Sequence, residues 1–272
     1  MKKVKILDVQ FDVCTKDEAL RRILDFLEFR KGESGKQIVT PNPEMLLESS
    51  KNKQFHTILN RAWLSIPDGI GILWASAFKK ISRHNSGLSK LIKAKLCFLS
   101  LLFYPKLCKK VFPERITGVD LMESICAVSR KSKTPIFLLG AKDGVAVEAQ
   151  KFLETKYAGV NVVGTFSGSA SDDDFPAIQA IIAETQPEIL FVAYGSPAQE
   201  LWISKHLPEL KSVKIAMGVG GAFDFLSGHK KRAPNWMHKI GLEWLYRLIQ
   251  EPSRIKRIWN AVIRFPLHVL RS

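Results

Sequence analysis

Short apolar runs alternate along the chain with segments whose apolar positions recur every three to four residues. Apolar runs bounded by turn residues are typical of buried strands, and the longer periodic segments are typical of amphipathic helices. The predicted strands are Val4–Val9, Gln37–Thr40, Ala62–Ile66, Pro135–Leu139, Val160–Gly164, Ile189–Tyr194 and Val213–Gly218. The predicted helices are Lys16–Phe29, Glu44–Leu59, Ile70–Phe78, Leu121–Arg130, Val145–Tyr157, Phe175–Thr185 and Ala198–His206.

This alternation predicts the fold class. Strands that take turns with helices favour an α/β fold with a Rossmann-like, mostly parallel sheet flanked by helices and joined by right-handed crossovers. Ligands of such sheets bind at the carboxyl ends of the strands. We expect the α/β body to span residues 1–228 and a basic helical appendage to span residues 229–272.

Two segments stand outside the rhythm. Residues 82–112 are basic and apolar, and they contain nine uncharged residues at 96–104 between lysines. This run is shorter than the roughly 20 residues that cross a bilayer, but it suits an anionic membrane interface. A helical insertion packed on the body is the alternative. In the tail, an apolar helix face extends up to Pro266, where we expect the helix to be interrupted. This face binds membrane, folds over the active site, or does both. This face comprises Ile255, Ile258, Trp259, Val262 and Ile263.

The net charge of +15 is unevenly distributed. Nine lysines and arginines and no acidic residue lie between Lys79 and Pro113, and ten lie after residue 228 against two glutamates. An evenly basic chain would indicate nucleic acid, whereas two basic segments on a nearly neutral body indicate surfaces for phosphates. The cysteines, Cys14, Cys97, Cys108 and Cys126, have no metal or redox spacing. We expect a cytoplasmic protein, with no signal peptide, that is peripheral on the inner face of the membrane.

Two strand ends carry polar side chains. Thr40 and Asn42 follow a predicted strand in a turn stiffened by prolines, and they either line a site or cap a helix. Asp68 follows the next strand, and Gly69 beside it lets backbone approach a ligand closely. The Asp68 carboxylate suits the removal of a proton from a sugar hydroxyl, although an aspartate also caps helices well.

Glycine turns end three further strands. Gly195 precedes a helix start at which backbone amides would hold a diphosphate, and Gln199 in that helix can hydrogen-bond a base or a sugar. Gly140, Gly220 and Gly221 belong to other turns of this kind. None of these turns completes a dinucleotide fingerprint or a P-loop.

We expect no metal and no cofactor. Residues 172–174 are three aspartates and contain the Asp-x-Asp pattern of metal-dependent sugar transferases. Because they follow Ser171 and precede a predicted helix, capping explains them. The histidines show no ligand spacing.

The tail carries arginines beside tryptophans. Arg254 and Arg257 are three residues apart and therefore share a helix face, and Arg247 precedes them in the same tail. A guanidinium suits phosphate oxygens because its fork is bidentate and permanently charged. A solvated basic face is the simpler alternative.

Taken together, these segments resemble the WecG/TagA/CpsF family of bacterial glycosyltransferases, in order, from about residue 37 to 257. The matching stretches are Thr40–Glu44, Pro67–Gly71, Arg115–Leu121, Ile136–Gly140, Gly195–Glu200, Gly218–Asp224, Arg232–Pro234 and Gly241–Trp244.

The resemblance implies an inverting, metal-independent transferase. It would pass N-acetylmannosamine, its uronic acid or a related sugar from UDP to a polyprenyl-diphosphate-linked N-acetylglucosamine, for teichoic acid, exopolysaccharide or another surface polymer. The resemblance makes Asp68 the base and places Thr40, Asn42 and Gln199 in the pocket. The tail arginines at positions 247, 254 and 257 would complete the site at the membrane. With Arg115 they would stabilise the departing diphosphate.

The long basic segment 82–112 departs from the family pattern, so attachment through the tail alone is in doubt. Two alternatives from other classes are a nucleic-acid-binding protein and a non-catalytic membrane adaptor. The apolar helices are also compatible with a homo-oligomer.

Overall fold

The computed structural model describes residues 1–29, 33–81, 111–234, 236–237 and 241–272. Its main feature is a six-stranded parallel sheet in the order β4-β3-β8-β7-β5-β6. The strands are β3 (Lys36–Val39), β4 (Leu64–Ser65), β5 (Pro135–Gly140), β6 (Asn161–Phe166), β7 (Ile189–Ala193) and β8 (Ile215–Gly218). The predicted α/β fold with a parallel sheet flanked by helices is confirmed. Almost all of the predicted insertion 82–112 lies outside the described residues.

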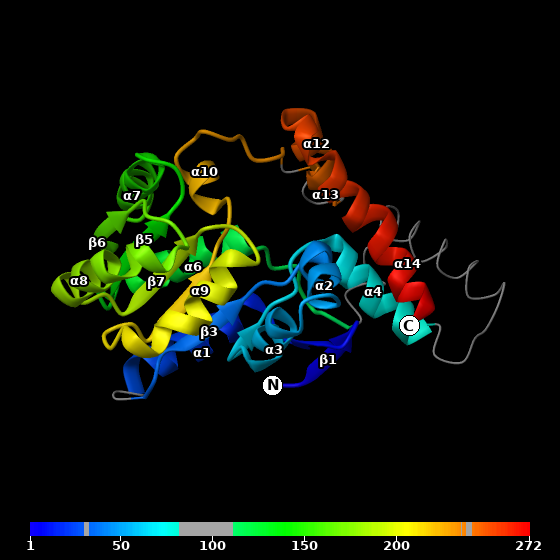
Figure 1. Cartoon of the computed structure of the whole chain (residues 1–272), viewed down its shortest axis with the longest axis horizontal. Coiled ribbons are helices and arrows are strands. Elements are labelled where there is room, and N and C mark those ends of the chain that lie inside the picture. The colour runs from blue at the N-terminus through cyan, green and yellow to red at the C-terminus, as the bar shows by residue number, and fades with distance from the viewer. Residues whose placement is uncertain (30–32, 82–110, 235, 238–240) are drawn as a thin grey trace.

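Helices cover both faces of this sheet (Figure 1). They are α1 (Lys16–Phe29), α2 (Pro43–Ser49), α3 (Lys53–Arg61), α4 (Ile70–Ile81), α6 (Gly118–Ser129), α7 (Val145–Lys156), α8 (Phe175–Thr185), α9 (Ala198–His206), α10 (Ala222–Leu226), α12 (Glu243–Gln250), α13 (Ile255–Trp259) and α14 (Phe265–Arg271). Within the described residues, no helix is long and apolar enough to cross a membrane.

The strand side chains alternate between two hydrophobic layers, as the two-residue period of a strand requires. In β5, Ile136 and Leu138 pack in the layer that contains α1, α6, α7 and α10. Phe137 and Leu139 pack in the layer that contains α8 and α9. Because both faces are covered, the central strands are apolar at almost every position, which makes them easy to recognise in the sequence.

The predicted strand Val4–Val9 is wrong. The segment forms two antiparallel strands, β1 (Lys3–Ile6) and β2 (Val9–Asp12), outside the main sheet. Leu7 and Asp8 have φ angles of 45° and 63°, and two successive positive φ angles are typical of the tight turn that joins hairpin strands. Leucine is uncommon in such a turn, so the pattern gave no turn signal.

Two predicted helix boundaries are also wrong. The predicted helix Glu44–Leu59 is divided into α2 and α3, because the Asn52 side chain accepts a hydrogen bond from Phe55 N and begins a new helix. Pro266 does not interrupt the tail. A π-helical turn at Asn260–Arg264 precedes it, and Pro266 lies in the first turn of α14, where a missing N–H is tolerated.

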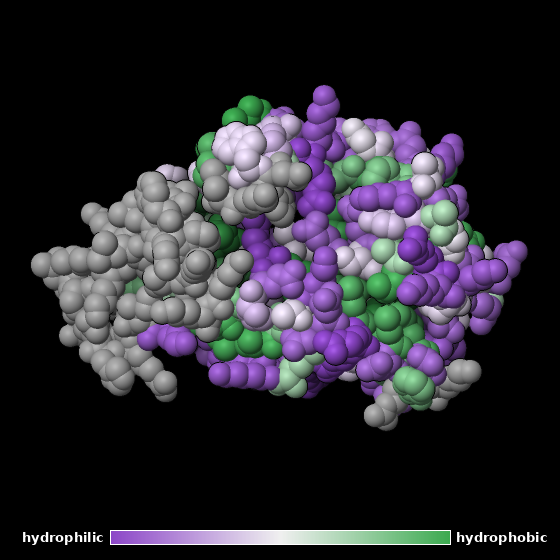
Figure 2. Space-filling model, turned by 180° about the vertical axis from the view of Figure 1, so that it is seen from behind, coloured by the Kyte–Doolittle hydropathy of each residue, from purple (hydrophilic) through white to green (hydrophobic). Residues whose placement is uncertain are grey.

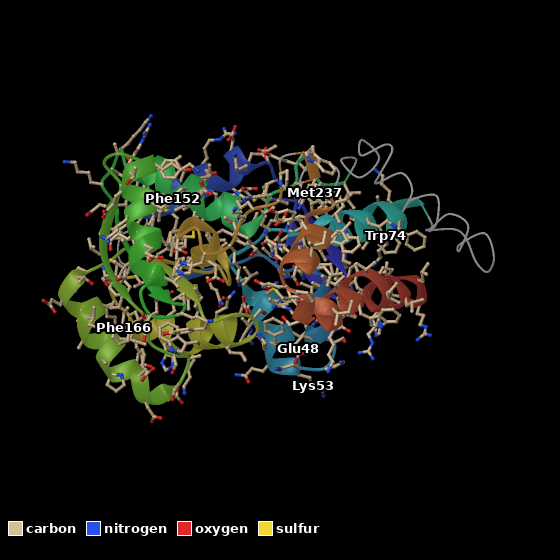
Figure 3. All side chains as sticks on the ribbon, turned by 90° about the horizontal axis from the view of Figure 1, so that it is seen from above. Glu48, Lys53, Trp74, Phe152, Phe166 and Met237 are labelled. Atoms are coloured by element: carbon tan, nitrogen blue, oxygen red, sulfur yellow. The ribbon has the colours of Figure 1, made fainter. Side chains whose placement is uncertain are left out.

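The tail is packed onto the body. α14 contacts α2 and α4 and buries Phe265 and Val269 in a third hydrophobic layer with Trp74 of α4. Figure 3 shows α14 beside the helix that carries Trp74. The tail therefore shares a core with the body instead of extending away from it.

The molecular face seen from behind is largely hydrophilic where the described residues are visible, with apolar patches between polar groups (Figure 2).

Candidate active site

The turns after β3 and β4 are held together by their backbones. Ile66 N donates to Val39 O (3.0 Å), and Asp68 N donates to Pro41 O (3.0 Å). Gly69 has a φ of 89°, which turns the chain into α4 directly after Asp68. The Asp68 side chain is thereby fixed at the carboxyl edge of the sheet, beside the motif that contains Thr40 and Asn42.

The N-terminus of α6 approaches Asp68. Gly118 N donates a long hydrogen bond of 3.4 Å to Asp68 Oδ2. A Cβ atom at Gly118 would lie only 3.0 Å from Thr40 Oγ1 and 3.7 Å from Asp68 Oδ2, so glycine is what allows this approach. Gly118 and Thr117, which caps α6 by accepting from Asp120 N, lie in the matching stretch Arg115–Leu121 but were not among the predicted site residues. The turn Arg115–Gly118 was the signal that could have found them.

A pocket of about 180 Å³ opens above Asp68. Seven of the residues predicted to form the site line it: Asn42, Asp68, Gly69, Arg115, Arg247, Arg254 and Arg257. The residues that prediction missed include Thr117, Glu243, Trp244 and Ile258. The body and the tail therefore share one concave site that combines a carboxylate with four guanidinium groups.

Asn42 caps a helix, which was one of the two roles predicted for it. Its Oδ1 accepts from Met45 N (3.0 Å) at the start of α2. The partly exposed Asn42 still borders the pocket, so its cap and its place at the site coexist. Thr40 lies behind Asp68, against α6, and is not among the residues that line this pocket.

Carboxylates hold the four arginines. Glu243, at the start of α12, accepts from Arg115 Nη2 at 3.0 Å and from Arg247 Nη2 at 2.7 Å. Arg254 pairs with Glu251, and Arg257 Nε donates to Glu44 Oε2 at 2.9 Å. These pairs hold the four arginines in place among the residues that line the pocket.

The pKa of Asp68 is raised to about 6. Burial is the largest cause, because it disfavours the charged form, and the negative charge of Glu243 acts in the same direction. Arg115, Arg247 and the Gly118 N–H oppose this rise. A carboxylate with this pKa is mostly ionised at neutral pH and is a stronger base than an ordinary aspartate, so it suits proton removal.

The remaining predicted residues form a second group at the same sheet edge. Gln199 Oε1 accepts from Gly195 N (3.1 Å) and from Gly220 N (2.9 Å), which joins the turns after β7 and β8. Gln199 Nε2 donates to the buried Glu200 (2.7 Å). Gly140 ends β5 with a φ of 97°, and Gly221 precedes α10. These residues do not line the Asp68 pocket.

The three aspartates at 172–174 form a short turn capped by Ser171. Asp172 pairs with Lys205 and with His206. In the described ranges, no three histidine, cysteine, aspartate or glutamate side chains are grouped as a metal site would require.

Comparison with known proteins agrees with this architecture. The chain matches the model of the family described as "Glycosyl transferase WecG/TagA/CpsF family" over residues 4–94 and 99–272. It is 31% identical over 255 residues to the N-acetylglucosaminyldiphosphoundecaprenol N-acetyl-beta-D-mannosaminyltransferase of Bacillus subtilis (strain 168), covering 93% of this chain and 87% of that protein. The protein of the same name from Bacillus spizizenii (strain ATCC 23059 / NRRL B-14472 / W23) is 30% identical over 255 residues, covering 93% and 85%.

The match spans the sheet, the Asp68 turn and the arginine-bearing tail alike, so it includes both halves of the pocket. It favours an enzyme over the two alternatives, a nucleic-acid-binding protein and a non-catalytic adaptor. The chain belongs to the WecG/TagA/CpsF family and is a glycosyltransferase.

Proposed function

We propose that this enzyme transfers N-acetylmannosamine, or a closely related sugar such as its uronic acid, from a UDP-linked donor to N-acetylglucosamine on a polyprenyl diphosphate. The printed names of the two relatives supply the sugar and the acceptor. The observation that carries the proposal is the pocket itself, in which the partly buried Asp68 shares one concave site with four arginines.

In this proposal Asp68 is the general base. Its carboxylate takes the proton of the acceptor hydroxyl while that oxygen attacks the anomeric carbon of the donor. The new C–O bond forms as the bond to the diphosphate breaks on the opposite face, so the anomeric centre inverts and UDP leaves with the electron pair. A general base contributes roughly 100- to 10,000-fold to such a rate.

The arginines stabilise the departing diphosphate. Negative charge develops on the phosphate oxygens as the sugar leaves, and guanidinium groups held in place by the protein meet that charge without reorganisation. The glycine turns joined by Gln199 lie at the same sheet edge, and we place the nucleotide beside them, although Gly195 N and Gly220 N themselves donate to Gln199 Oε1.

The tail also holds the enzyme at the membrane surface, where a polyprenyl acceptor resides. α13 and its neighbours expose Ile249, Ile255, Trp259 and Leu267, each with 46% or more of its surface accessible, next to basic residues. Apolar side chains beside arginines are typical of helices that lie in an anionic interface. We infer peripheral attachment on the side of the membrane that carries the UDP-sugar.

The test incubates purified enzyme with a lipid-linked N-acetylglucosamine diphosphate and, in separate reactions, UDP-N-acetylmannosamine, its uronic acid and UDP-N-acetylglucosamine. UDP release and glycolipid product are both measured. Asp68→Asn is compared with Asp25→Asn, an exposed aspartate on α1 outside the pocket. A reaction with a metal chelator runs alongside.

We expect acceptor-dependent product with one donor, resistant to the chelator, retained in Asp25→Asn and reduced at least about 100-fold in Asp68→Asn. Turnover in Asp68→Asn equal to that of the wild type would refute the base assignment. Loss of product with the chelator would refute the assignment of diphosphate stabilisation to arginines alone.

A further inference from the structure

Glu243 occupies a central position in the pocket. It is the first residue of α12, its side chain is 16% exposed, and each of its two oxygens accepts from a different arginine. Arg115 comes from the body, just before α6, and Arg247 comes from the next turn of α12. One carboxylate therefore connects a body guanidinium with a tail guanidinium at the mouth of the site.

We propose that Glu243 is a positioning residue of the transfer reaction. It holds Arg115 and Arg247 at the pocket and offsets their positive charges, so that these charges do not weaken Asp68 as a base. The inference rests on the proposed role of Asp68 as the base. It assigns a task to a residue that belongs to the matching stretch Gly241–Trp244 but was not among the predicted site residues.

The first step of the argument is charge balance. Two guanidinium groups beside one partly buried carboxylate would attract it, and an arginine-paired carboxylate is a weaker base because the pair favours its charged form. Glu243 accepts from the same two arginines at 2.7 and 3.0 Å, within ordinary hydrogen-bond range. Glu243 therefore competes with Asp68 for these two guanidinium groups, and within the described part of the chain the Asp68 side chain accepts one long hydrogen bond, from Gly118 N.

The charged groups around Asp68 agree with this interpretation. They are Glu243 and Arg247 from α12, Arg115 from the segment before α6, and the N–H of Gly118 at the start of α6. Burial raises the pKa of Asp68 most, Glu243 raises it next, and the other three lower it. Glu243 is thus the only side chain in this set that acts with burial to keep Asp68 basic.

The second step concerns the arginines. Arg247 also lies over the Phe225 ring, with its Cζ atom 4.8 Å from the ring centroid. The stacking fixes the plane of the guanidinium, and Glu243 fixes its rotation, so the geometry for a phosphate is set before the ligand arrives. Without Glu243, the like charges of Arg115 and Arg247 would repel each other and their side chains would be less ordered.

The experiment compares the wild type with Glu243→Gln, Glu243→Asp and the control Glu148→Gln. Glu148 is an exposed residue of α7 that pairs with His229 away from the pocket. kcat/KM and KM for the donor are measured from pH 5 to 9. In parallel, the carboxyl carbon of Asp68 is titrated by NMR without substrate, its signal assigned by its absence in Asp68→Asn.

We expect the acidic limb of kcat/KM to move to lower pH by about half a unit or more in Glu243→Gln, because a like charge has been removed. The donor KM rises several-fold in the same variant. Glu243→Asp keeps the charge and restores the position of the limb, and Glu148→Gln superimposes on the wild type. An acidic limb and an Asp68 titration that stay unchanged in Glu243→Gln overturn the proposal, whatever the loss of rate.

The two measurements distinguish this inference from the proposed function. If the wild type forms no product with any donor, the proposed reaction is wrong, while the NMR titration still decides whether Glu243 controls the ionisation of Asp68. If product forms and Asp68 titrates identically in both proteins, the reaction stands and the role of Glu243 is refuted.

Discussion

The guanidinium of Arg257 donates to the carboxylate of Glu44 across 213 positions of the chain, with distances to Glu44 Oε2 of 2.9 Å from Nε and 2.8 Å from Nη2. Glu44 is the second residue of α2, directly after the turn that contains Asn42, and Arg257 lies in α13. The pair therefore joins the body and the tail at the rim of the pocket. Its side chains are 24% and 54% exposed, so it contributes at most about 1 kcal/mol to stability.

Replacing Arg257 should therefore affect catalysis more than folding. We expect Arg257→Ala to lower kcat/KM by roughly 10- to 100-fold, because a cation for the diphosphate is lost. The kcat/KM of Arg257→Lys should lie between those of Arg257→Ala and the wild type, since lysine keeps the charge but not the planar fork. The free energy of unfolding in urea should change by less than about 1 kcal/mol in both. If Arg257→Ala has the kcat/KM of the wild type, Arg257 does not stabilise the departing diphosphate.

The rate should depend on pH through Asp68. The base must be ionised to accept a proton, and its pKa is raised to about 6. kcat/KM should therefore be nearly constant above pH 7 and fall about tenfold for each unit below 6. Initial rates in buffers of constant ionic strength test this expectation. A profile that stays flat down to pH 4.5 would mean that a group of ordinary carboxyl pKa, or none, is titrating.

The same raised pKa predicts that Asp68 costs stability. A carboxyl whose pKa is higher in the folded state than in the unfolded chain binds protons more tightly when folded, so the folded state loses stability as pH rises from about 4 to 6. Asp68→Asn removes this cost. We expect Asp68→Asn to be more stable than the wild type by about 1–3 kcal/mol at pH 7.5, and the difference to shrink steadily toward pH 4. Urea unfolding at several pH values measures it, and an Asn variant less stable than the wild type at pH 7.5 would contradict the buried-charge argument.

Much of the sheet was predictable because its strands are buried on both faces. β5 and β7 are continuous apolar runs, and α1 begins and ends where its apolar period does. The hairpin turn at Leu7 and the break at Asn52 were not predictable from hydrophobicity, because each depends on a local backbone or capping interaction inside an apparently continuous pattern. Pro266 was misleading because the π-helical turn before it has no hydrophobic signature.

The site was predictable where a reactive side chain follows a strand or where arginines are concentrated. Asp68 follows a strand and the arginines are concentrated in the tail, and the structure brings both into one pocket. Glu243 was missed because a glutamate in the first turn of a helix is ordinary, and its partner Arg115 is 128 positions away. Its significance depends on how the tail packs on the body, which no local pattern specifies.

The proposed membrane attachment through the tail predicts that a surface change on α13 weakens membrane binding without weakening the fold. Ile255 and Trp259 are 56% and 57% exposed on α13. We expect Trp259→Glu to weaken binding to vesicles that contain anionic lipid several-fold, while changing the free energy of unfolding by less than about 0.5 kcal/mol. Cosedimentation with vesicles, at low and high salt, provides the measurement. Lys133→Glu, a charge change on the body before β5, serves as the control. Equal vesicle binding by Trp259→Glu and the wild type would exclude this face of α13 as the contact.

The packing of α14 predicts that the tail is part of the cooperative fold. Phe265 is fully buried in the layer formed by α2, α4 and the β1–β2 hairpin, whereas Leu267, on the same helix, is 46% exposed. Phe265→Ala removes a large buried side chain and leaves a cavity, so we expect a loss of about 3–5 kcal/mol in the free energy of unfolding. Leu267→Ala should cost less than about 1 kcal/mol, since its side chain already meets solvent. Urea unfolding followed by tryptophan fluorescence, with Trp74 in the same layer as a reporter, measures both variants. If Phe265→Ala unfolds with the midpoint and slope of the wild type, α14 is not bound to the body in solution, and the arginines of α12 and α13 would then have to be brought to Asp68 by the substrate or the membrane.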